Sequence, residues 1–304
     1  MSPKDRITVV IACYDDGSTL EEAVGSAESE PRCEVIVVND GSSDPHTVQV
    51  LKRLAARGIR VMHQENQGSA SARMTGISAS TTEYVLPLDA DDFLISGGVG
   101  LLADFLDANP DVDVVWGRYR YVGERTHEKP VARELDPWLI TYLDDIPMSA
   151  LFRRGVLEGV GGWSFDDAYE DWDLWMTLAE RRARGVGLSV PVYCHRLHGI
   201  RRNRRAKPRE AEILADLRNR HPALFAKRAE NRARSTAPVL LKLALPALER
   251  LRWPSLHRRR TASAIVLHVA HRRGGYHRPL LRLLARIGAH PRGRPLRTAV
   301  GNPP

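Results

Sequence analysis

The chain has 304 residues, with 45 Lys and Arg against 37 Asp and Glu and a formal net charge of +8. Hydrophobic residues make up 43% and charged residues 27%, which is typical of folded globular proteins and excludes a disordered chain or a disulfide-stapled miniature fold. Three widely spaced cysteines, Cys13, Cys33 and Cys194, supply neither a disulfide framework nor a CxxC metal clip. This cysteine usage predicts buried thiols and a cytoplasmic protein.

Apolar segments are short throughout the chain. No run approaches the ~20 apolar residues of a membrane-spanning helix. The N-terminal segment reaches Asp15 and Asp16 before it could form the apolar core of a secretory signal. We therefore expect neither an integral membrane protein nor a secreted one.

Charge is distributed unevenly along the chain. Residues 231–304 hold 16 Lys or Arg and one acid, Glu249, for a net charge of +15. Residues 1–230 hold the other 29 bases and 36 acids, for a net charge of −7. We expect two parts: an α/β domain over residues 1–230 and a basic, mainly helical extension over residues 231–304.

The first ninety residues alternate between strand and helix patterns. Continuous apolar, β-branched runs are typical of strands buried on both faces of a parallel sheet. Amphipathic stretches between these runs are typical of helices. The expected strands are residues 7–13, 33–39, 59–63 and 84–88, and the expected helices are residues 18–30, 44–57 and 69–80. This alternation predicts a doubly wound α/β sheet with right-handed crossovers.

The pattern after residue 92 is more mixed. We expect helices at residues 98–108, 137–143 and 169–184, and strands at residues 111–122 and 148–152. In the last of these helices, Leu174, Trp175, Leu178 and Ala179 share the face expected to point inward. Residues 1–230 therefore read as one mixed α/β domain with flanking helices.

Acidic and polar residues follow the predicted strands at their carboxyl ends. Tyr14 to Asp16 come after the first strand, Asp40 after the second, and Asp89 to Asp92 after the fourth. Doubly wound sheets bind ligands at this edge. The segment LDADD places Asp89, Asp91 and Asp92 within four positions, where they repel one another unless a cation or hydrogen-bond donors compensate. Hard ions such as Mg²⁺ or Mn²⁺ suit such oxygen donors; the alternative is a solvated loop whose aspartates cap the next helix.

Six short motifs follow one another between about residues 5 and 200. They are VVIACYDDGSTLEEAVGSA from Val9, EVIVVNDGSSD from Glu34, NQGSASARMTGI from Asn66, YVLPLDADD from Tyr84, GVGGWS from Gly159 and YEDWDLWMTL from Tyr169. In order and spacing they resemble the family 2 inverting glycosyltransferases, which share the glycosyltransferase-A fold. The resemblance implies that the chain transfers a sugar from a nucleotide-sugar donor to an acceptor hydroxyl.

The resemblance implies a set of nucleotide-binding positions. Tyr14 and Asp40 match positions that hold the base and ribose, Arg73 matches the basic residue of the NxGxxxAR segment, and Asp89 matches an acid on the ribose side. Ala12 is expected to contact the nucleotide as well, although it and Cys13 stand where a proline and a small polar residue are more frequent. Asn39 likewise replaces a commoner aspartate before Asp40.

The resemblance also implies the metal and catalytic positions. Asp91 matches the ligand of a divalent ion, Mn²⁺ or Mg²⁺, on the diphosphate. His198 matches a histidine near that ion, with His195 as a competitor. Asp171 matches the general base, with Glu170 as the alternative. Taken without the resemblance, both acids would simply cap the helix that they begin.

Two tryptophans are candidates for the acceptor pocket. Trp163 follows a glycine pair and could stack on a sugar face, or could anchor the core. Trp172 is the other candidate, although it and Trp175 follow the helical period, which favours the core.

The basic extension of residues 231–304 predicts one of two roles. Basic amphipathic segments bind anionic membrane surfaces, which would place the protein peripherally at the inner face of the membrane. Alternatively, its helices pack on the catalytic body with solvated arginines. No aromatic or recognition-helix pattern favours nucleic acid, and none is expected as a partner.

The sequence thus predicts a metal-dependent inverting glycosyltransferase that uses a UDP-sugar. The acceptor would be a glycan, a lipid-linked sugar or a small molecule, in the synthesis of a cell-surface glycan or glycoconjugate. The alternative is a non-catalytic member that binds a nucleotide sugar or serves as a scaffold. A nucleotidyltransferase is disfavoured, since Tyr14 to Gly17 lack a glycine-rich phosphate loop with a lysine.

Overall fold

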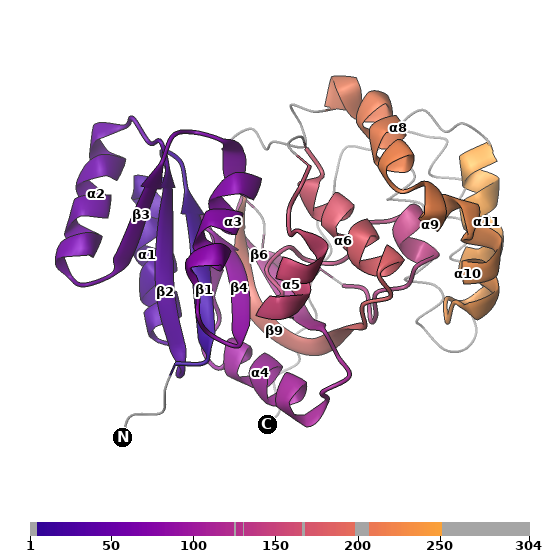
Figure 1. Cartoon of the computed structure of the whole chain (residues 1–304), viewed down its shortest axis with the longest axis horizontal. Coiled ribbons are helices and arrows are strands. Elements are labelled where there is room, and N and C mark those ends of the chain that lie inside the picture. The colour runs from indigo at the N-terminus through magenta and orange to yellow at the C-terminus, as the bar shows by residue number, and fades with distance from the viewer. Residues whose placement is uncertain (1–4, 125, 130, 166–167, 198–206, 251–304) are drawn as a thin grey trace, which may run out of the picture. The chain divides into compact units, whose positions relative to one another are not determined.

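The computed structural model describes residues 5–124, 126–129, 131–165, 168–197 and 207–250 (Figure 1). The chain divides into two compact units, Met1–Thr236 and Ala237–Pro304. The predicted boundary after residue 230 falls inside helix α10, Arg228–Arg234, which belongs to the first unit.

The first unit is built on one mixed sheet, with nine strands in the described residues. Along the sheet the order is β3-β2-β1-β4-β8-β6-β9-β5, and β7 pairs with β6. The strands are β1 Ile7–Cys13, β2 Cys33–Asp40, β3 Arg60–Gln64, β4 Tyr84–Asp89, β5 Phe93–Leu94, β6 Val114–Gly123, β7 His127–Lys129, β8 Leu151–Arg153 and β9 Gly185–Leu197.

Most strands of this sheet point the same way. β3, β2, β1 and β4 are parallel neighbours, and β8 is antiparallel both to β4 and to β6. β6 therefore runs in the direction of β4, and β9 pairs with β6 in parallel. The carboxyl ends of β1, β2, β4, β6 and β9 consequently lie along one edge of the sheet.

Helices cover both faces of the sheet (Figure 1). Residues from α1 and α4 join Ile7, Val9 and Ile11 of β1 in the buried core on one face. α3 packs on the opposite face beside Val10. The helices of the first unit are α1 Gly17–Glu28, α2 Pro45–Ala56, α3 Gly68–Ala79, α4 Gly98–Ala108, α5 Arg154–Val160, α6 Glu170–Glu180, α8 Glu210–Arg220, α9 Pro222–Ala226 and α10, with short 3-10 turns at Leu139–Thr141 and Lys207–Arg209.

The approach of α3 to the sheet depends on Gly76. A Cβ atom at this position would lie 2.3 Å from Cγ1 of Val10 and 3.1 Å from Cγ2 of Val38. The absence of a side chain therefore lets α3 sit close against β1 and β2. This contact matters for the site described below, because α3 also carries Arg73.

The main departure from the predicted elements is β9, whose 13 residues we did not expect to form a strand. The segment contains Gly185, Gly187 and Pro191, which disfavour a regular strand. The structure accommodates them through register shifts in the β6–β9 ladder around Arg118, opposite Pro191. The helix expected at residues 137–143 is also wrong in extent, since only the 3-10 turn Leu139–Thr141 forms.

In the second unit, the structure describes one helix, α11 Val239–Arg250, which continues through Pro246. The rest of the basic extension, residues 251–304, lies outside the described residues. In the described part of the chain, none of the helices has the length and apolar character needed to cross a membrane.

Candidate active site

The carboxyl ends of the parallel strands gather the residues predicted to bind a nucleotide. Tyr14 follows β1 and is 50% exposed, Asp40 ends β2, and Asp89 ends β4. In the sheet register Ala12 lies between Val38 and Asp89 of the neighbouring strands. Residues far apart in the sequence therefore meet at one edge, as expected for ligand binding by this type of sheet.

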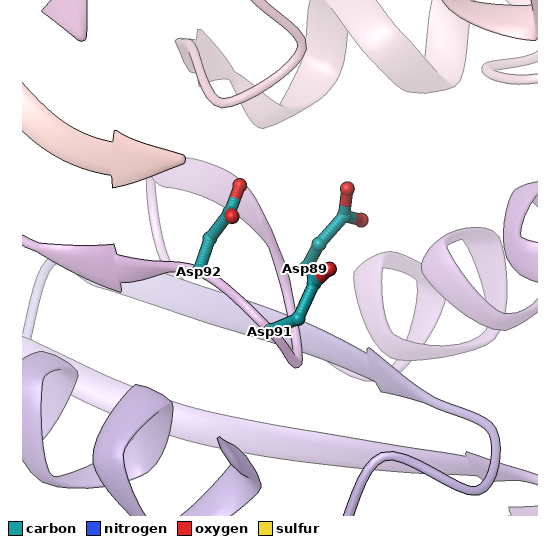
Figure 2. A group of neighbouring side chains, drawn as sticks. All are labelled: Asp89, Asp91 and Asp92. Carbon is teal, nitrogen blue, oxygen red and sulfur yellow. The ribbon is translucent and has the colours of Figure 1, made fainter. Parts of the chain in front are cut away.

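The end of β4 and the loop that follows it carry the three predicted acids. Asp89, Asp91 and Asp92 each have a carboxylate oxygen within 4.8 Å of the others. Figure 2 shows the three side chains rising from the same side of this loop. Such crowding of like charges needs compensation from donors or a cation.

Asp92 is the buried member of the loop. Its Oδ2 lies 2.9 Å from Nδ1 of His195, and its Oδ1 accepts a 2.9 Å hydrogen bond from the backbone N–H of Arg196. Burial raises the pKa of Asp92 to about 6, and the bond to His195 opposes that rise. Asp92 thus ties the loop to β9, whereas Asp89 and Asp91 are half-buried and reach the surface.

Asp89 and Asp91 suit a divalent cation. Mg²⁺ and Mn²⁺ take hard oxygen ligands, usually one or two carboxylates together with substrate phosphates. The short separation of these carboxylates would let both reach a single ion. The other predicted ligand, His198, lies outside the described residues, and its competitor His195 has Nδ1 against Asp92.

Arg73 joins this acidic loop to the start of α6. Its Nη2 donates to Asp89 Oδ1 at 2.8 Å, and its Nη1 donates to Glu170 Oε1 at 3.2 Å. The side chain is buried; burial alone lowers the pKa of Arg73, but the charges of Asp89 and Glu170 outweigh it and raise the pKa above its usual range. Both Nη groups thus point at protein carboxylates, and the contact of Arg73 with the nucleotide stays a prediction.

The two acids at the start of α6 have different surroundings. Glu170 is buried and accepts hydrogen bonds from Arg73 and, at 3.3 Å, from Oγ of Ser69. Asp171 is half-buried, and its Oδ1 accepts a 2.9 Å bond from the backbone N–H of Trp172. Of the two, Asp171 is therefore the carboxylate better placed to meet a substrate.

Asp40 is buried and holds the segment that leads into α3. Its carboxylate accepts hydrogen bonds from the backbone N–H groups of Gln67 and Gly68, both at 2.9 Å, and from Nε2 of Gln64 at 2.7 Å. A carboxylate offers about four acceptor positions. The predicted contact to a nucleobase N–H would use the remaining one.

Asp15 has a structural role that the sequence did not reveal. This residue adopts a left-handed conformation, with φ 56°, and its Oδ1 accepts 2.8 Å bonds from the backbone N–H groups of Ser43 and Asp44. Its own N–H donates to Oγ of Ser42. Asp15 thus fastens the loop after β1, which carries Tyr14, to the loop after β2.

The structure does not support Trp163 and Trp172 as an acceptor pocket. They are 5% and 2% exposed, so neither ring has a face available to a sugar. Trp172 Nε1 donates to the carbonyl oxygen of Ile140 at 2.6 Å, which anchors α6 in the core. The Trp163 ring lies 5.7 Å from Cζ of Arg73 and packs edge-on against Phe152. The apolar packing of both indoles explains the difference from the expectation.

A row of rings across β7, β6 and β9 was missed in the sequence. His127, Tyr121 and His195 occupy paired positions on these strands. The rings of Tyr121 and His127 lie 4.7 Å apart, and those of Tyr121 and His195 lie 5.5 Å apart. Since His195 contacts Asp92, the row leads from the acidic loop to the exposed His127. The spacing of Tyr119 and Tyr121, two positions apart in β6, was the sequence feature that could have indicated rings on one face of this strand.

A second pair of rings lies beside this row. Tyr119 and Tyr193 are stacked with their centroids 5.2 Å apart. Burial raises the pKa of Tyr193, and the charges of Asp92, Asp89 and Asp171 add to the rise. Tyr193 therefore lies within the electrostatic influence of acids from both the β4–β5 loop and α6.

Comparison with known proteins identifies the family. The chain matches the family model "Glycosyl transferase family 2" over residues 8–161, half of its length. The protein therefore belongs to glycosyl transferase family 2. The predicted family is confirmed.

Two curated relatives illustrate the similarity. Poly-beta-1,6-N-acetyl-D-glucosamine synthase of Staphylococcus aureus (strain COL) is 31% identical over 120 residues, which cover 38% of this chain and 29% of that protein. Uncharacterized glycosyltransferase YibD of Escherichia coli (strain K12) is 33% identical over 163 residues, covering 51% of this chain and 46% of that protein. The matches thus span less than half the length of either relative.

Solved structures confirm the glycosyltransferase-A type fold. Staphylococcus aureus TarS 1-349, in complex with UDP-GlcNAc, superposes with a TM-score of 0.63 at 19% identity, covering 75% of this chain and 69% of that chain. Mannosyltransferase PcManGT from Pyrobaculum calidifontis, in complex with GDP-Man and Mn²⁺, gives a TM-score of 0.52 at 21% identity, covering 94% and 80%.

Proposed function

We propose that the protein is a metal-dependent inverting glycosyltransferase that uses a UDP-sugar. The observation that carries the proposal is the convergence of Asp89, Asp91 and the first turn of α6 at one edge of the sheet, joined through Arg73. Two carboxylates would serve the donor diphosphate, and Asp171 would serve the acceptor. A non-catalytic member would have no need to keep all these acids together.

The donor would bind across the ends of β1, β2 and β4. The half-exposed ring of Tyr14 offers a face for the base, and the remaining acceptor position of Asp40 suits the N–H of uracil. Ala12 pairs with Asp89 in the β1–β4 register, so its backbone would lie beside the ribose. The ligands bound in TarS, UDP-GlcNAc and UDP, support the choice of uridine, while PcManGT holds GDP-Man and Mn²⁺.

Asp91 would hold Mg²⁺ or Mn²⁺ against the diphosphate, and Asp89, predicted on the ribose side, would lie within reach of the same ion. When bound, such an ion stabilises the negative charge that develops on the leaving oxygens. Asp171 accepts the proton of the attacking acceptor hydroxyl as the bond to the anomeric carbon forms and the bond to the nucleoside diphosphate breaks. A single displacement of this kind inverts the anomeric centre. The position of Asp171 in the first turn of α6 favours its ionised form.

The acceptor would lie beside the rings at the carboxyl ends of β6 and β9. Tyr121 and His127 combine an apolar surface with polar edges, which suits the C–H face and hydroxyls of a sugar. They take the place of the buried Trp163 and Trp172 as our acceptor candidates. The acceptor class we propose is a glycan or lipid-linked sugar, in the synthesis of a cell-surface glycan at the cytoplasmic face of the membrane.

Release of nucleoside diphosphate tests this function. Purified protein would be incubated with UDP-GlcNAc, UDP-glucose or GDP-mannose, an acceptor sugar, and Mn²⁺, Mg²⁺ or EDTA. We expect release from a UDP-sugar that EDTA abolishes and that Asp171→Asn lowers. Asp216→Asn, on the exposed surface of α8, is the matched control and should retain activity. Protein that binds the nucleotides but releases none would support the non-catalytic alternative.

A further inference from the structure

Arg73 occupies a position between the donor side and the acceptor side of the site. Asp89 ends β4, and Glu170 begins α6, 81 residues later in the chain. The guanidinium contacts both, at 2.8 Å and 3.2 Å, so it is the shared partner of a strand end and a helix start. Glu170 directly precedes Asp171, the proposed base.

The ion pair between Arg73 and Glu170 is buried, so breaking it costs stability. Arg73 is 3% exposed and Glu170 is 9% exposed. Removing one partner from a buried ion pair leaves an uncompensated charge in a poorly solvated place. Arg73 is therefore constrained to keep carboxylate partners, and the buried Glu170 is constrained by Arg73, whereas the Asp89 side chain is 35% exposed.

The surroundings of Arg73 hold its side chain in place. The Trp163 ring lies under the guanidinium, 5.7 Å from Cζ. Ser69, one turn earlier on α3, also donates to Glu170. The close packing of Gly76 on Val10 fixes α3 against the sheet. α3 therefore connects the sheet to the first turn of α6 through two side chains.

Arg73 points inward, with both Nη groups on protein acceptors and its Nε buried without a hydrogen-bond partner. These contacts suit a residue that joins two elements of the protein better than one that binds a nucleotide. We propose that Arg73 is a positioning residue, which sets the place of Asp171 relative to Asp89 by holding Glu170. This inference rests on the proposed function, and it assigns Glu170 to the support of Asp171 rather than to proton transfer.

Kinetics of Glu170→Gln, Arg73→Lys and the double variant test the inference. Glu170→Gln should lower kcat by roughly tenfold or more, because small displacements of a catalytic group are costly, while the Kd for UDP, measured by calorimetry, stays within about threefold. Arg73→Lys should also lower kcat, and the double variant should be no slower than Arg73→Lys alone, since both changes break one bridge.

Arg153→Lys is the matched control. Arg153 is a partly buried arginine in β8 that donates to backbone carbonyls of Val112 and Leu106 and forms an ion pair with Glu83, an acid outside the candidate site. This change should lower the melting temperature without changing kcat.

Three results would overturn the inference. In the first, Glu170→Gln keeps the wild-type kcat. In the second, the effects of the two single changes multiply in the double variant. In the third, Arg73→Lys weakens UDP binding while kcat is preserved, which would restore the direct nucleotide contact. Failure of the proposed function is distinguishable, because the wild type itself would then release no diphosphate from any nucleotide sugar.

Discussion

Neighbouring acids in this protein differ in what they can do because their environments differ. Asp92 and Glu170 are buried and engaged with His195 and Arg73, whereas Asp91 and Asp171, each one residue away, are half-buried. Burial thus separates supporting carboxylates from those that can meet a substrate. Without the family resemblance, the sequence shows two acidic pairs and does not rank their members.

The substitution Asp171→Asn tests the proposed general base. The amide cannot accept the hydroxyl proton, so we expect kcat to fall by roughly 10²- to 10⁴-fold. The Kd for UDP should stay near the wild-type value, because Asp171 is placed on the acceptor side. Steady-state kinetics with calorimetry of UDP measures both quantities. An Asp171→Asn enzyme with full activity would contradict the assignment.

At the scale of elements, the sheet and its first helices could be predicted well from the sequence. The strands at residues 7–13, 33–39 and 84–88 agree with β1, β2 and β4 to within one residue. Their continuous apolar runs signal burial on both faces. β9 was missed because glycines and Pro191 hide its pattern, and its bulges are defined only by pairing with β6.

The candidate site could be predicted only in part, because some of its contacts depend on tertiary pairing. Strand ends locate Tyr14, Asp40 and Asp89, since parallel strands bring their carboxyl ends together. The bridge from Arg73 to Glu170 joins residues 97 positions apart. No local pattern encodes such a contact, and the rings on β6 and β9 likewise depend on tertiary pairing.

Helix α3 places Arg73 between Asp89 and Glu170, so the geometry of the site depends on how α3 packs on the sheet. We expect Gly76→Ala to destabilise the fold, because overpacking against Val10 costs about 1–3 kcal/mol and outweighs the gain of about 1 kcal/mol in helix propensity. The displaced α3 would also move Arg73, so kcat should fall. Thermal denaturation and kinetics check this. Ala79→Gly, at the end of the same helix, is a comparison that should lower stability without loss of kcat. Unchanged stability in Gly76→Ala would contradict the close packing.

The attachment of α8 and α9 to α6 predicts a pH dependence of stability. His221 lies between α8 and α9, with Nε2 2.9 Å from Asp173 Oδ1 and Nδ1 3.2 Å from Glu180 Oε2. Arg220 also donates to Asp173. Burial lowers the pKa of His221, but the bonds to Asp173 and Glu180 outweigh burial and raise the pKa above 6.5.

A raised histidine pKa stabilises the folded state where the ring is protonated. The contribution is fully present below about pH 6.5, the unfolded value, and is lost as the pH rises through the folded pKa. The difference in melting temperature between wild type and His221→Asn should therefore shrink between pH 6 and pH 9. Denaturation scans across this range measure it. A difference that grows with pH would contradict the assignment.

At the scale of the whole molecule, the sequence separates an acidic body from a basic extension. The described start of the second unit, α11, exposes Val239 and Leu243, at 72% and 61%. Such apolar side chains in a segment of net charge +15 favour contact with an anionic membrane surface. We propose this contact as the means by which the enzyme reaches a lipid-linked or surface acceptor.

Liposome co-sedimentation tests that contact in the full chain. Wild type should bind vesicles rich in anionic lipid and bind far less to neutral ones. The double change Val239→Glu and Leu243→Glu should weaken binding several-fold, since it removes apolar insertion and adds negative charge. The same double change to alanine serves as the milder control. Equal binding by all three proteins would contradict a role for α11.

A thermal-shift panel of UDP, GDP, dTDP and CDP, each with and without Mn²⁺, on wild type and Asp91→Ala tests the nucleotide-sugar site most directly. A ligand that binds the folded state raises the melting temperature, and at 100 times its Kd the gain is about 2.7 kcal/mol, a shift of several degrees. We expect a manganese-dependent shift with UDP that is lost in Asp91→Ala. No shift with any nucleotide, on wild-type protein shown to be folded, would contradict a nucleotide-sugar site at this edge of the sheet.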